Sequence, residues 1–260
     1  MLSTSKGAIY KWGLPLLIVI VIFLFWEIMV FIQDIPRWLL PPPSAVIMSL
    51  IIDYKIIFNH TWITLLEVVL GFVIALSAGF LLASVIGISK TIEKSIYPFL
   101  IASQTIPIIV IAPMLLVWVG YGLLPKVIVV ALISFFPIVV NTSDGMRSID
   151  GDMEKLLLTM GAHKWHIFFK LRIPTSIPYL LSGMKVAMPL CVIGAVIGEW
   201  VGSSQGLGYL MIRSKPQFQT ELVFAAILIL SIMGITLFLL VGIIERLMIP
   251  WLHDSKKINE

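Results

Sequence analysis

Long apolar runs separated by short polar segments dominate this sequence. Each run holds about 20 residues, which is roughly the length of helix that crosses the apolar core of a membrane. We therefore predict an all-α polytopic membrane protein that forms a single domain over residues 1–260. The predicted spans cover residues 14–32, 68–88, 96–119, 123–141, 177–201 and 222–244.

The first run resembles a secretory signal peptide, because Lys6 and Lys11 precede it. It is long enough to span, however, and no small-x-small cleavage site follows it, so we predict a retained helix. Glu27 inside it is predicted to lie near the outer interface or to pair with another helix. After the prolines at 41–43, Ser44 is expected to cap a short surface helix over residues 45–52.

The second run carries Gly71, Ala75 and Gly79 at intervals of four residues. Small residues in such a row let two membrane helices approach closely. We expect this face to pack tightly against another span.

Other spans contain polar residues and helix breakers. Prolines interrupt the third run, and Gln104 and Thr105 lie between them. A broken membrane helix survives only where protein or a water-filled cavity satisfies its backbone. Gln104, Thr105 and Asn141 could thus line a translocation path, or each could form an interhelical hydrogen bond. Glu199, beside Trp200, is either part of a path or gate, or an interfacial carboxylate in water.

The longest polar interruption covers residues 150–178. Asp150 can cap a helix whose apolar positions recur at helical spacing. Gly161 should end or bend that helix, since glycine costs about 1 kcal/mol against alanine in a helix interior. Pro174 and Pro178 should mark the next boundary. We predict a helix, a turn and a second helix leading into the membrane, suited to being held by another protein.

Charge sets the expected orientation. With the N-terminus inside, 12 Lys and Arg residues fall in inner segments and 5 in outer loops, with Lys185 unassigned. The positive-inside rule favours this arrangement, so both termini and the loop at 142–176 are predicted to be cytoplasmic. The inner residues are Lys6, Lys11, Lys90, Lys94, Arg147, Lys155, Lys164, Lys170, Arg172, Arg246, Lys256 and Lys257; the outer ones are Arg37, Lys55, Lys126, Arg213 and Lys215.

Several classes of chemistry find no support. No P-loop occurs, and no catalytic constellation is evident, so we predict a non-enzymatic chain without cofactor. His163 and His166 have a possible metal spacing but no further ligands, and we predict no metal site and no nucleic-acid partner. The residues at 119–122 match part of a potassium-filter sequence, but Trp118 replaces the required threonine, which favours an outer turn.

The polar interruption resembles the cytoplasmic loop of the permease subunits of bacterial ABC importers. Gly161-Ala162-His163-Lys164-Trp165 and Leu171-Arg172-Ile173-Pro174 match that pattern, while Lys155-Leu156-Leu157 stands where Glu-Ala-Ala is usual and Glu154 is one residue early. The stretches at 40–46 and 198–209 resemble the branch that imports nitrate, sulfonates, taurine and thiamine precursors. The stretches at 118–122 and 137–147 are closest to importers of vitamin precursors.

The resemblance implies a bacterial cytoplasmic membrane, a second permease copy that would form a homodimer, separate ATPase subunits and an extracytoplasmic binding protein. The solute would be a thiamine or riboflavin precursor, or a sulfonate- or nitrate-type anion. An ion channel, an intramembrane enzyme and a membrane scaffold are the alternatives. The residues expected to couple to the ATPase are Glu154, Leu157, Met160, Gly161, Ala162, Trp165, Ile173 and Pro174, with Leu157, Met160 and Trp165 as apolar anchors.

Overall fold

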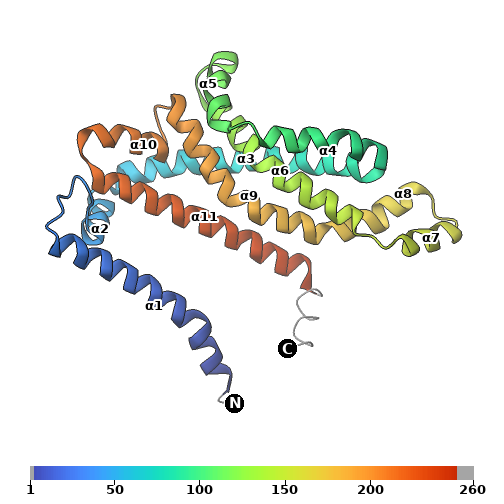
Figure 1. The fold of residues 1–260 in the computed structure, drawn as a ribbon, viewed down its shortest axis with the longest axis horizontal. Coiled ribbons are helices and arrows are strands. Elements are labelled where there is room, and N and C mark those ends of the chain that lie inside the picture. Colours follow the sequence, from blue (N-terminus) through green and yellow to red (C-terminus); the bar gives the residue numbers. More distant parts are fainter. Residues whose placement is uncertain (1–2, 251–260) are drawn as a thin grey trace. The chain divides into compact units, whose positions relative to one another are not determined.

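The computed structural model describes residues 3–250, and almost all of them are helical (Figure 1). Lys256 and Lys257, which the charge count places inside, lie outside this range. The described chain forms two compact units, one of residues up to 59 with 210–229 and one of 60–209 with the residues from 230 onward. The elements are α1 (Ser3–Ile32), α2 (Pro43–Ile52), α3 (Tyr54–Ile88), α4 (Lys90–Gln104), α5 (Ile108–Val119), α6 (Leu123–Arg147), α7 (Gly151–Thr159), α8 (Lys164–Ile167), the π-helical turn η1 (Phe168–Arg172), α9 (Ile173–Gly202), α10 (Leu207–Ser214), the 3-10 turn η2 (Lys215–Gln217) and α11 (Thr220–Met248).

The helices confirm the predicted fold class. Five stretches are long and apolar enough to cross a membrane, and α4 with α5 makes a sixth if the two count as one broken span. These two helices meet at an angle of 94°. The bend falls at residues 105–107, where Pro107 cannot donate a backbone hydrogen bond, whereas Pro98 and Pro113 remain inside helices.

Helix ends differ from the predicted span ends where polar residues continue an apolar run. α3 begins 14 residues before residue 68, at Tyr54, and α6 continues past residue 141 to Arg147. The expected boundary at Pro174 and Pro178 is wrong, because α8, η1 and α9 form one helical stretch from Lys164 to Gly202. Pro174 directly follows the π-helical turn, in which the Ile173 amide donates to Phe168 O, so the hydrogen-bond register changes just before the proline.

In the larger unit, α3 and α9 pack closely against α6. A Cβ atom at Gly79 would lie 2.8 Å from Ile138 of α6, and one at Gly87 would lie 2.6 Å from the Met146 sulfur. A Cβ atom at Gly183 of α9 would lie 2.8 Å from the Pro137 carbonyl oxygen. The small-residue face predicted on the second span is thus the face that contacts α6.

In the smaller unit, Glu27 of α1 binds the start of α2. The Ser44 amide donates to Glu27 Oε2 at 3.0 Å, and the Ser44 hydroxyl donates to Oε1 at 2.6 Å. Of the two alternatives for Glu27, the structure shows pairing. The expected Ser44 cap is wrong, since α2 starts at Pro43 and its cap residue, Pro42, offers no side-chain donor or acceptor.

Candidate functional site

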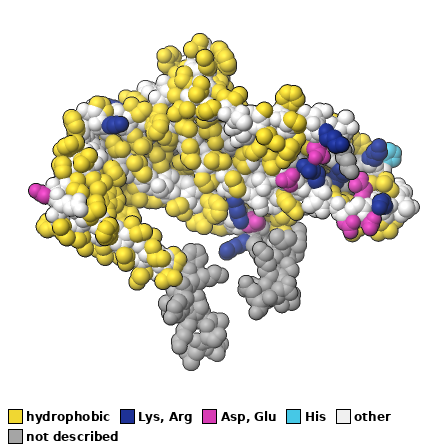
Figure 2. All heavy atoms as spheres, viewed as in Figure 1, with side chains coloured by type: hydrophobic (Ala, Val, Ile, Leu, Met, Phe, Trp, Pro, Cys, Tyr) yellow, Lys and Arg dark blue, Asp and Glu magenta, His cyan; other side chains and the backbone are white. Residues whose placement is uncertain are grey.

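The polar segment between α6 and α9 starts with a well-capped helix. Asp150 Oδ1 accepts a hydrogen bond from the Asp152 amide at 3.0 Å, which confirms the predicted cap of α7. Figure 2 shows charged side chains gathered over α7 and α8, on a face that is otherwise mostly hydrophobic. This segment is thus the main polar surface of the larger unit in that view.

Gly161 ends α7 through its backbone conformation. Its φ is +82°, and a Cβ atom there would meet nothing within 4 Å. The Gly161 amide donates to Leu158 O at 3.0 Å, and the Ala162 amide donates to Leu157 O at 2.9 Å. This is the Schellman ending, which needs a left-handed residue and pairs apolar side chains across the turn. Leu157 and Ala162 are both only partly exposed and therefore belong to the helix ending.

Two expected anchors are strongly exposed. Met160 is 75% exposed and Trp165 is 62% exposed. The Trp165 ring stacks on Phe169 with centroids 6.0 Å apart, which fixes its orientation without covering it. Leu156 and Leu158 of α7 are also exposed but were not predicted as anchors. Leu156 belongs to the apolar row of this helix, whereas Leu158, two positions further on, lies on another face.

Glu154 forms an ion pair that joins α7 to the start of α9. Arg172 Nη2 donates to Glu154 Oε1 at 2.9 Å, and Arg172 Nη1 donates to the carbonyl of Gly87 near the end of α3. A cavity of about 270 Å³ lies beside the pair, lined by Ile88, Glu154, Leu158, Lys164, Ile167, Phe168 and Arg172. Ile173 is partly exposed and Pro174 exposed, directly after this arginine.

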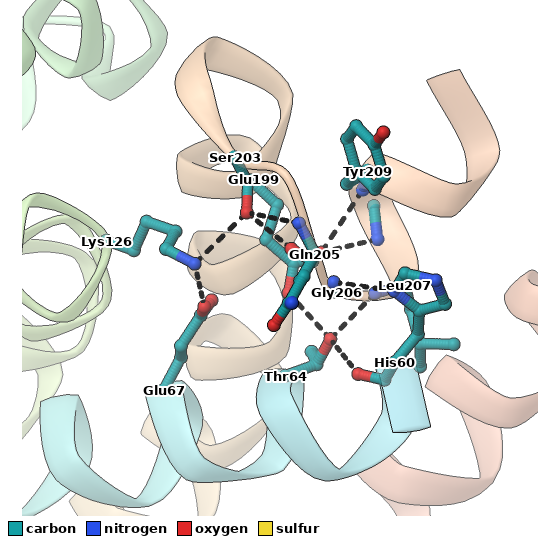
Figure 3. Close-up of polar contacts among 11 residues, drawn as sticks. His60, Thr64, Glu67, Lys126, Glu199, Ser203, Gln205, Gly206, Leu207 and Tyr209 are labelled. Atoms are coloured by element: carbon teal, nitrogen blue, oxygen red, sulfur yellow. Dashed lines mark hydrogen bonds and ion pairs between the residues drawn. The ribbon is translucent and has the colours of Figure 1, made fainter. Parts of the chain in front are cut away.

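Glu199 lies in a second polar cluster, which Figure 3 shows. Its side chain is buried, with only 1% of the residue exposed. Oε2 accepts hydrogen bonds from the Gly208 and Tyr209 amides, and Oε1 accepts one from the Thr64 hydroxyl at 2.6 Å. The alternative of an interfacial carboxylate in water is therefore wrong for this chain.

The loop after α9 is held by four successive backbone amides. Besides Gly208 and Tyr209, Leu207 donates to the Thr64 hydroxyl at 2.8 Å and Gly206 donates to His60 Nδ1 at 2.9 Å. Gly206 has φ +112°, and a Cβ atom there would overlap the Glu199 carboxyl. The Gly-Leu-Gly-Tyr sequence thus suits a loop that folds around a buried carboxylate.

Beside this cluster, Lys126 of α6 pairs with Glu67 of α3, and both are buried. Lys126 also donates to the Ser203 hydroxyl at 3.1 Å. Placing Lys126 in an outer loop was therefore incomplete, because its ammonium group is inside the protein. Isolated charges within apolar runs are the signal that could have identified this pair.

The other residues expected on a path do not join this cluster. Gln104 and Thr105 are exposed at the bend between α4 and α5, and the Thr105 hydroxyl donates to Ala102 O at 2.7 Å. The Asn141 amide donates to Pro137 O of its own helix at 2.8 Å, which differs from the expected interhelical bond. Across residues 3–250, no three His, Cys, Asp or Glu side chains are grouped to hold a metal ion.

These features define a helical, multi-pass membrane protein with one polar helical segment between two spans. The family described as the inner membrane component of binding-protein-dependent transport systems matches residues 71–250. The chain belongs to this family, and it is a permease subunit of an ABC importer in the inner membrane. The family works with a binding protein and an ATPase.

Two relatives and one solved structure illustrate the match. The formylaminopyrimidine transport permease protein ThiX of Halalkalibacterium halodurans is 40% identical, over 91% of this chain and 95% of the relative. The riboflavin transport system permease protein RibX of Chloroflexus aurantiacus is 33% identical, over 93% of this chain and 92% of the relative. The inward-facing MetNI methionine ABC transporter matches 75% of this chain and 96% of its own with a TM-score of 0.62 at 15% identity, which shows a shared fold.

Proposed function

We propose that two copies of this chain form the membrane path of an importer whose ATP hydrolysis occurs on separate cytoplasmic ATPase subunits. A binding protein on the outer side delivers the solute, and both termini of each copy lie in the cytoplasm. The segment from Glu154 to Lys170 docks on the ATPase, with Gly161 at its bend. Apolar side chains on the membrane-spanning helices contact lipid and the second copy.

One observation carries the docking assignment. Met160 and Trp165 have large, exposed apolar side chains in the segment over which Figure 2 shows charged side chains gathered. Such side chains suit a groove on a soluble partner, because buried apolar and aromatic anchors supply most of the binding energy when a helix lies in a groove. Gly161 and Ala162 hold the turn that separates these two anchors, while Glu154, Leu157, Ile173 and Pro174 support it from the flanking helices.

The solute is proposed from the relatives. The 40% identity to a formylaminopyrimidine permease over nearly the whole of both chains favours a thiamine-precursor pyrimidine. A riboflavin-type solute is the second candidate, because RibX is 33% identical over a similar length. Sulfonate-type anions are less favoured, since the sulfonate permease SsuC of Bacillus subtilis is 28% identical.

Glu199 is proposed to act at the outer end of the path as a loop anchor. It fixes residues 206–209 over the end of α9, so its role in gating would be to hold this loop rather than to touch the solute. Gln104, Thr105 and Asn141 stay proposed path residues. This role is best supported for Gln104 and Thr105, because both are exposed where the third span bends.

The test uses this chain purified together with its ATPase and binding protein. Met160→Ser and Trp165→Ser should each lower the amount of ATPase that co-purifies, since loss of an apolar anchor costs roughly 2 kcal/mol, or about thirtyfold in affinity. Lys155→Ser, at an exposed polar position of α7 in the same segment, is the matched control. Uptake of labelled formylaminopyrimidine by vesicles should require ATP. ATPase recovery at the wild-type ratio from both anchor variants would refute the docking surface, and uptake without ATP would favour a channel.

A further inference from the structure

α7 is attached only weakly to the membrane helices. None of its side chains is fully buried. Turns at residues 148–150 and 160–163 connect it to α6 and α8. The ion pair of Lys155 with Asp152 is exposed and lies within α7, so it does not attach α7 to another element. Among the described residues, Arg172 with Glu154 is the ion pair that joins α7 to the membrane-spanning part of the chain.

Arg172 uses both ends of its guanidinium group for two different elements. Nη2 binds the carboxylate of Glu154, while Nη1 binds the Gly87 carbonyl. Gly87 is in the last turn of α3, where carbonyl groups have no amide partner within the helix and where positive charge is favoured. The planar, forked group of arginine can serve both acceptors at once, which a lysine ammonium on its flexible stem does less well.

The contact continues from α3 into α6. Gly87 lies so close to Met146 that a Cβ atom at position 87 would be 2.6 Å from its sulfur. The ends of α3 and α6 are therefore in close contact. Contacts thus run without a gap from Glu154 of α7 through Arg172 to α3, and from α3 to α6.

The position of Arg172 also has a structural cause. It is the last residue of the π-helical turn η1, between α8 and α9. A π-helical turn inserts one extra residue into a helix and often occurs at functional sites. Ile167, just before this turn, and Phe168, its first residue, are both buried and anchor the arginine backbone against the rest of the unit.

We propose that Arg172 is the positioning residue that links the ATPase-docking helix α7 to α3, and so converts movement of α7 into movement of the membrane helices. This inference rests on the proposed function, because α7 must be moved by an ATPase. It assigns Arg172 neither to ATPase binding nor to solute binding. Loss of Arg172 should therefore separate ATP hydrolysis from transport.

The experiment compares Arg172→Gln with the wild-type chain in vesicles that contain the permease, ATPase and binding protein. Labelled formylaminopyrimidine is the probe, and uptake, ATP hydrolysis and subunit ratio are measured on the same sample. We expect ATPase co-purification at the wild-type ratio and continued hydrolysis, with solute taken up per ATP reduced about tenfold, which corresponds to about 1.4 kcal/mol of lost coupling. Arg172→Lys should give an uptake per ATP between that of the wild-type chain and that of Arg172→Gln.

Two further variants define the link. Glu154→Gln keeps the contact of Arg172 with α3 but weakens that with α7, and should also lower uptake per ATP. Lys155→Gln breaks the exposed pair of the same helix and should behave as wild type. The chain has one cysteine, Cys191, which is first replaced by serine. Leu158 and Ile88 line the same cavity, so Leu158→Cys with Ile88→Cys allows a short bifunctional thiol reagent to join α7 to α3 directly.

Cross-linking these two cysteines in the Arg172→Gln chain should restore uptake per ATP. If Arg172 contributed only its charge, or only to folding, cross-linking would not restore uptake per ATP. Wild-type uptake per ATP in Arg172→Gln overturns the proposal, and so does loss of uptake in proportion to loss of bound ATPase. Uptake per ATP that remains low after complete cross-linking also overturns it. Failure of the wild-type chain to bind any ATPase would instead refute the proposed function.

Discussion

At the scale of single residues, the buried pair of Lys126 and Glu67 has the largest expected effect on stability. Removing one partner of a buried ion pair leaves an unpaired charge and costs about 3–5 kcal/mol. Among the described residues, Lys126 is the cation that pairs with Glu67, and Glu67 Oε2 has no hydrogen-bond donor that could replace it. We expect Lys126→Met to lower the thermal unfolding midpoint of the purified protein in detergent.

The matched double variant distinguishes the charge from the packing. Lys126→Met with Glu67→Leu removes both charges, and replacing a buried pair by apolar residues is often neutral or stabilising. The double variant should therefore regain most of the lost stability. A double variant as unstable as Lys126→Met alone would show that packing around the lysine stem, and not the orphaned carboxylate, is responsible.

Glu199 leads to a prediction about the loop it anchors. Glu199→Gln keeps the shape of the side chain but removes the charge that accepts the Gly208 and Tyr209 amides, and hydrogen bonds to charged groups contribute about 1.5–3 kcal/mol each. We expect faster amide hydrogen exchange at residues 206–209 and reduced uptake, with ATPase still bound. Ser204→Ala, on an exposed neighbour, is the control. Unchanged exchange and wild-type uptake would remove Glu199 from the gate.

Local features of single residues were predictable, while distant partners were not. The cap at Asp150 and the turn at Gly161 depend on residues within four positions, so sequence spacing was sufficient. Glu199 instead meets Thr64, which lies 135 positions earlier, and Lys126 meets Glu67 across 59 positions. No periodicity within one helix indicates which charge of another helix it will face.

At the scale of elements, the turn between α7 and α8 depends on the left-handed conformation of Gly161. L-residues with a side chain pay roughly 1–2 kcal/mol there, whereas asparagine tolerates it comparatively well. Since a Cβ atom would meet no neighbour, the penalty comes from the backbone and not from lack of space. We expect Gly161→Trp to release the ATPase on detergent extraction and to abolish solute-stimulated ATP hydrolysis.

Gly161→Asn provides the comparison for this turn. It should keep most of the bound ATPase, because it can retain the Schellman ending. If Gly161→Trp co-purifies with ATPase at the wild-type ratio and supports ATP-driven uptake, the coupling role of this segment is wrong. If both variants lose the ATPase equally, any side chain at position 161 blocks binding. The partner then contacts the surface of the turn itself, and the left-handed conformation is not what it requires.

Helix existence was easier to predict than helix ends. The apolar runs correctly indicated a helical membrane protein, and the prolines of the third run correctly indicated a broken span. Proline position alone did not locate the break, because Pro98 and Pro113 are accommodated within α4 and α5. Pro174 does not break the helix either. The π-helical turn ends at Arg172, α9 begins at Ile173, and the helix continues through the proline.

At the scale of the whole molecule, the larger unit groups the segments by their predicted side of the membrane. Segments predicted to be inner meet through Arg147 with Glu93 and through Arg172 with Gly87 and Glu154. Two loops predicted to be outer meet at a cavity of about 540 Å³, lined by Tyr121, Gly122, Lys126 and residues 202–204. Both orientations across the membrane keep this grouping, so the choice of the inner side rests on the Lys and Arg distribution.

Single cysteines can test this orientation after Cys191→Ser. Tyr121 and Ser204 are exposed and predicted to be outside, while Ser148 and Asp152 are exposed and predicted to be inside. The positive-inside rule places the charged segment with Ser148 and Asp152 in the cytoplasm. Cysteines at Tyr121 and Ser204 should react with a membrane-impermeant thiol reagent added to intact cells, and those at Ser148 and Asp152 should react only after permeabilisation. Labelling of the Ser148 or Asp152 position in intact cells would invert the topology and exclude this segment from contact with a cytoplasmic ATPase.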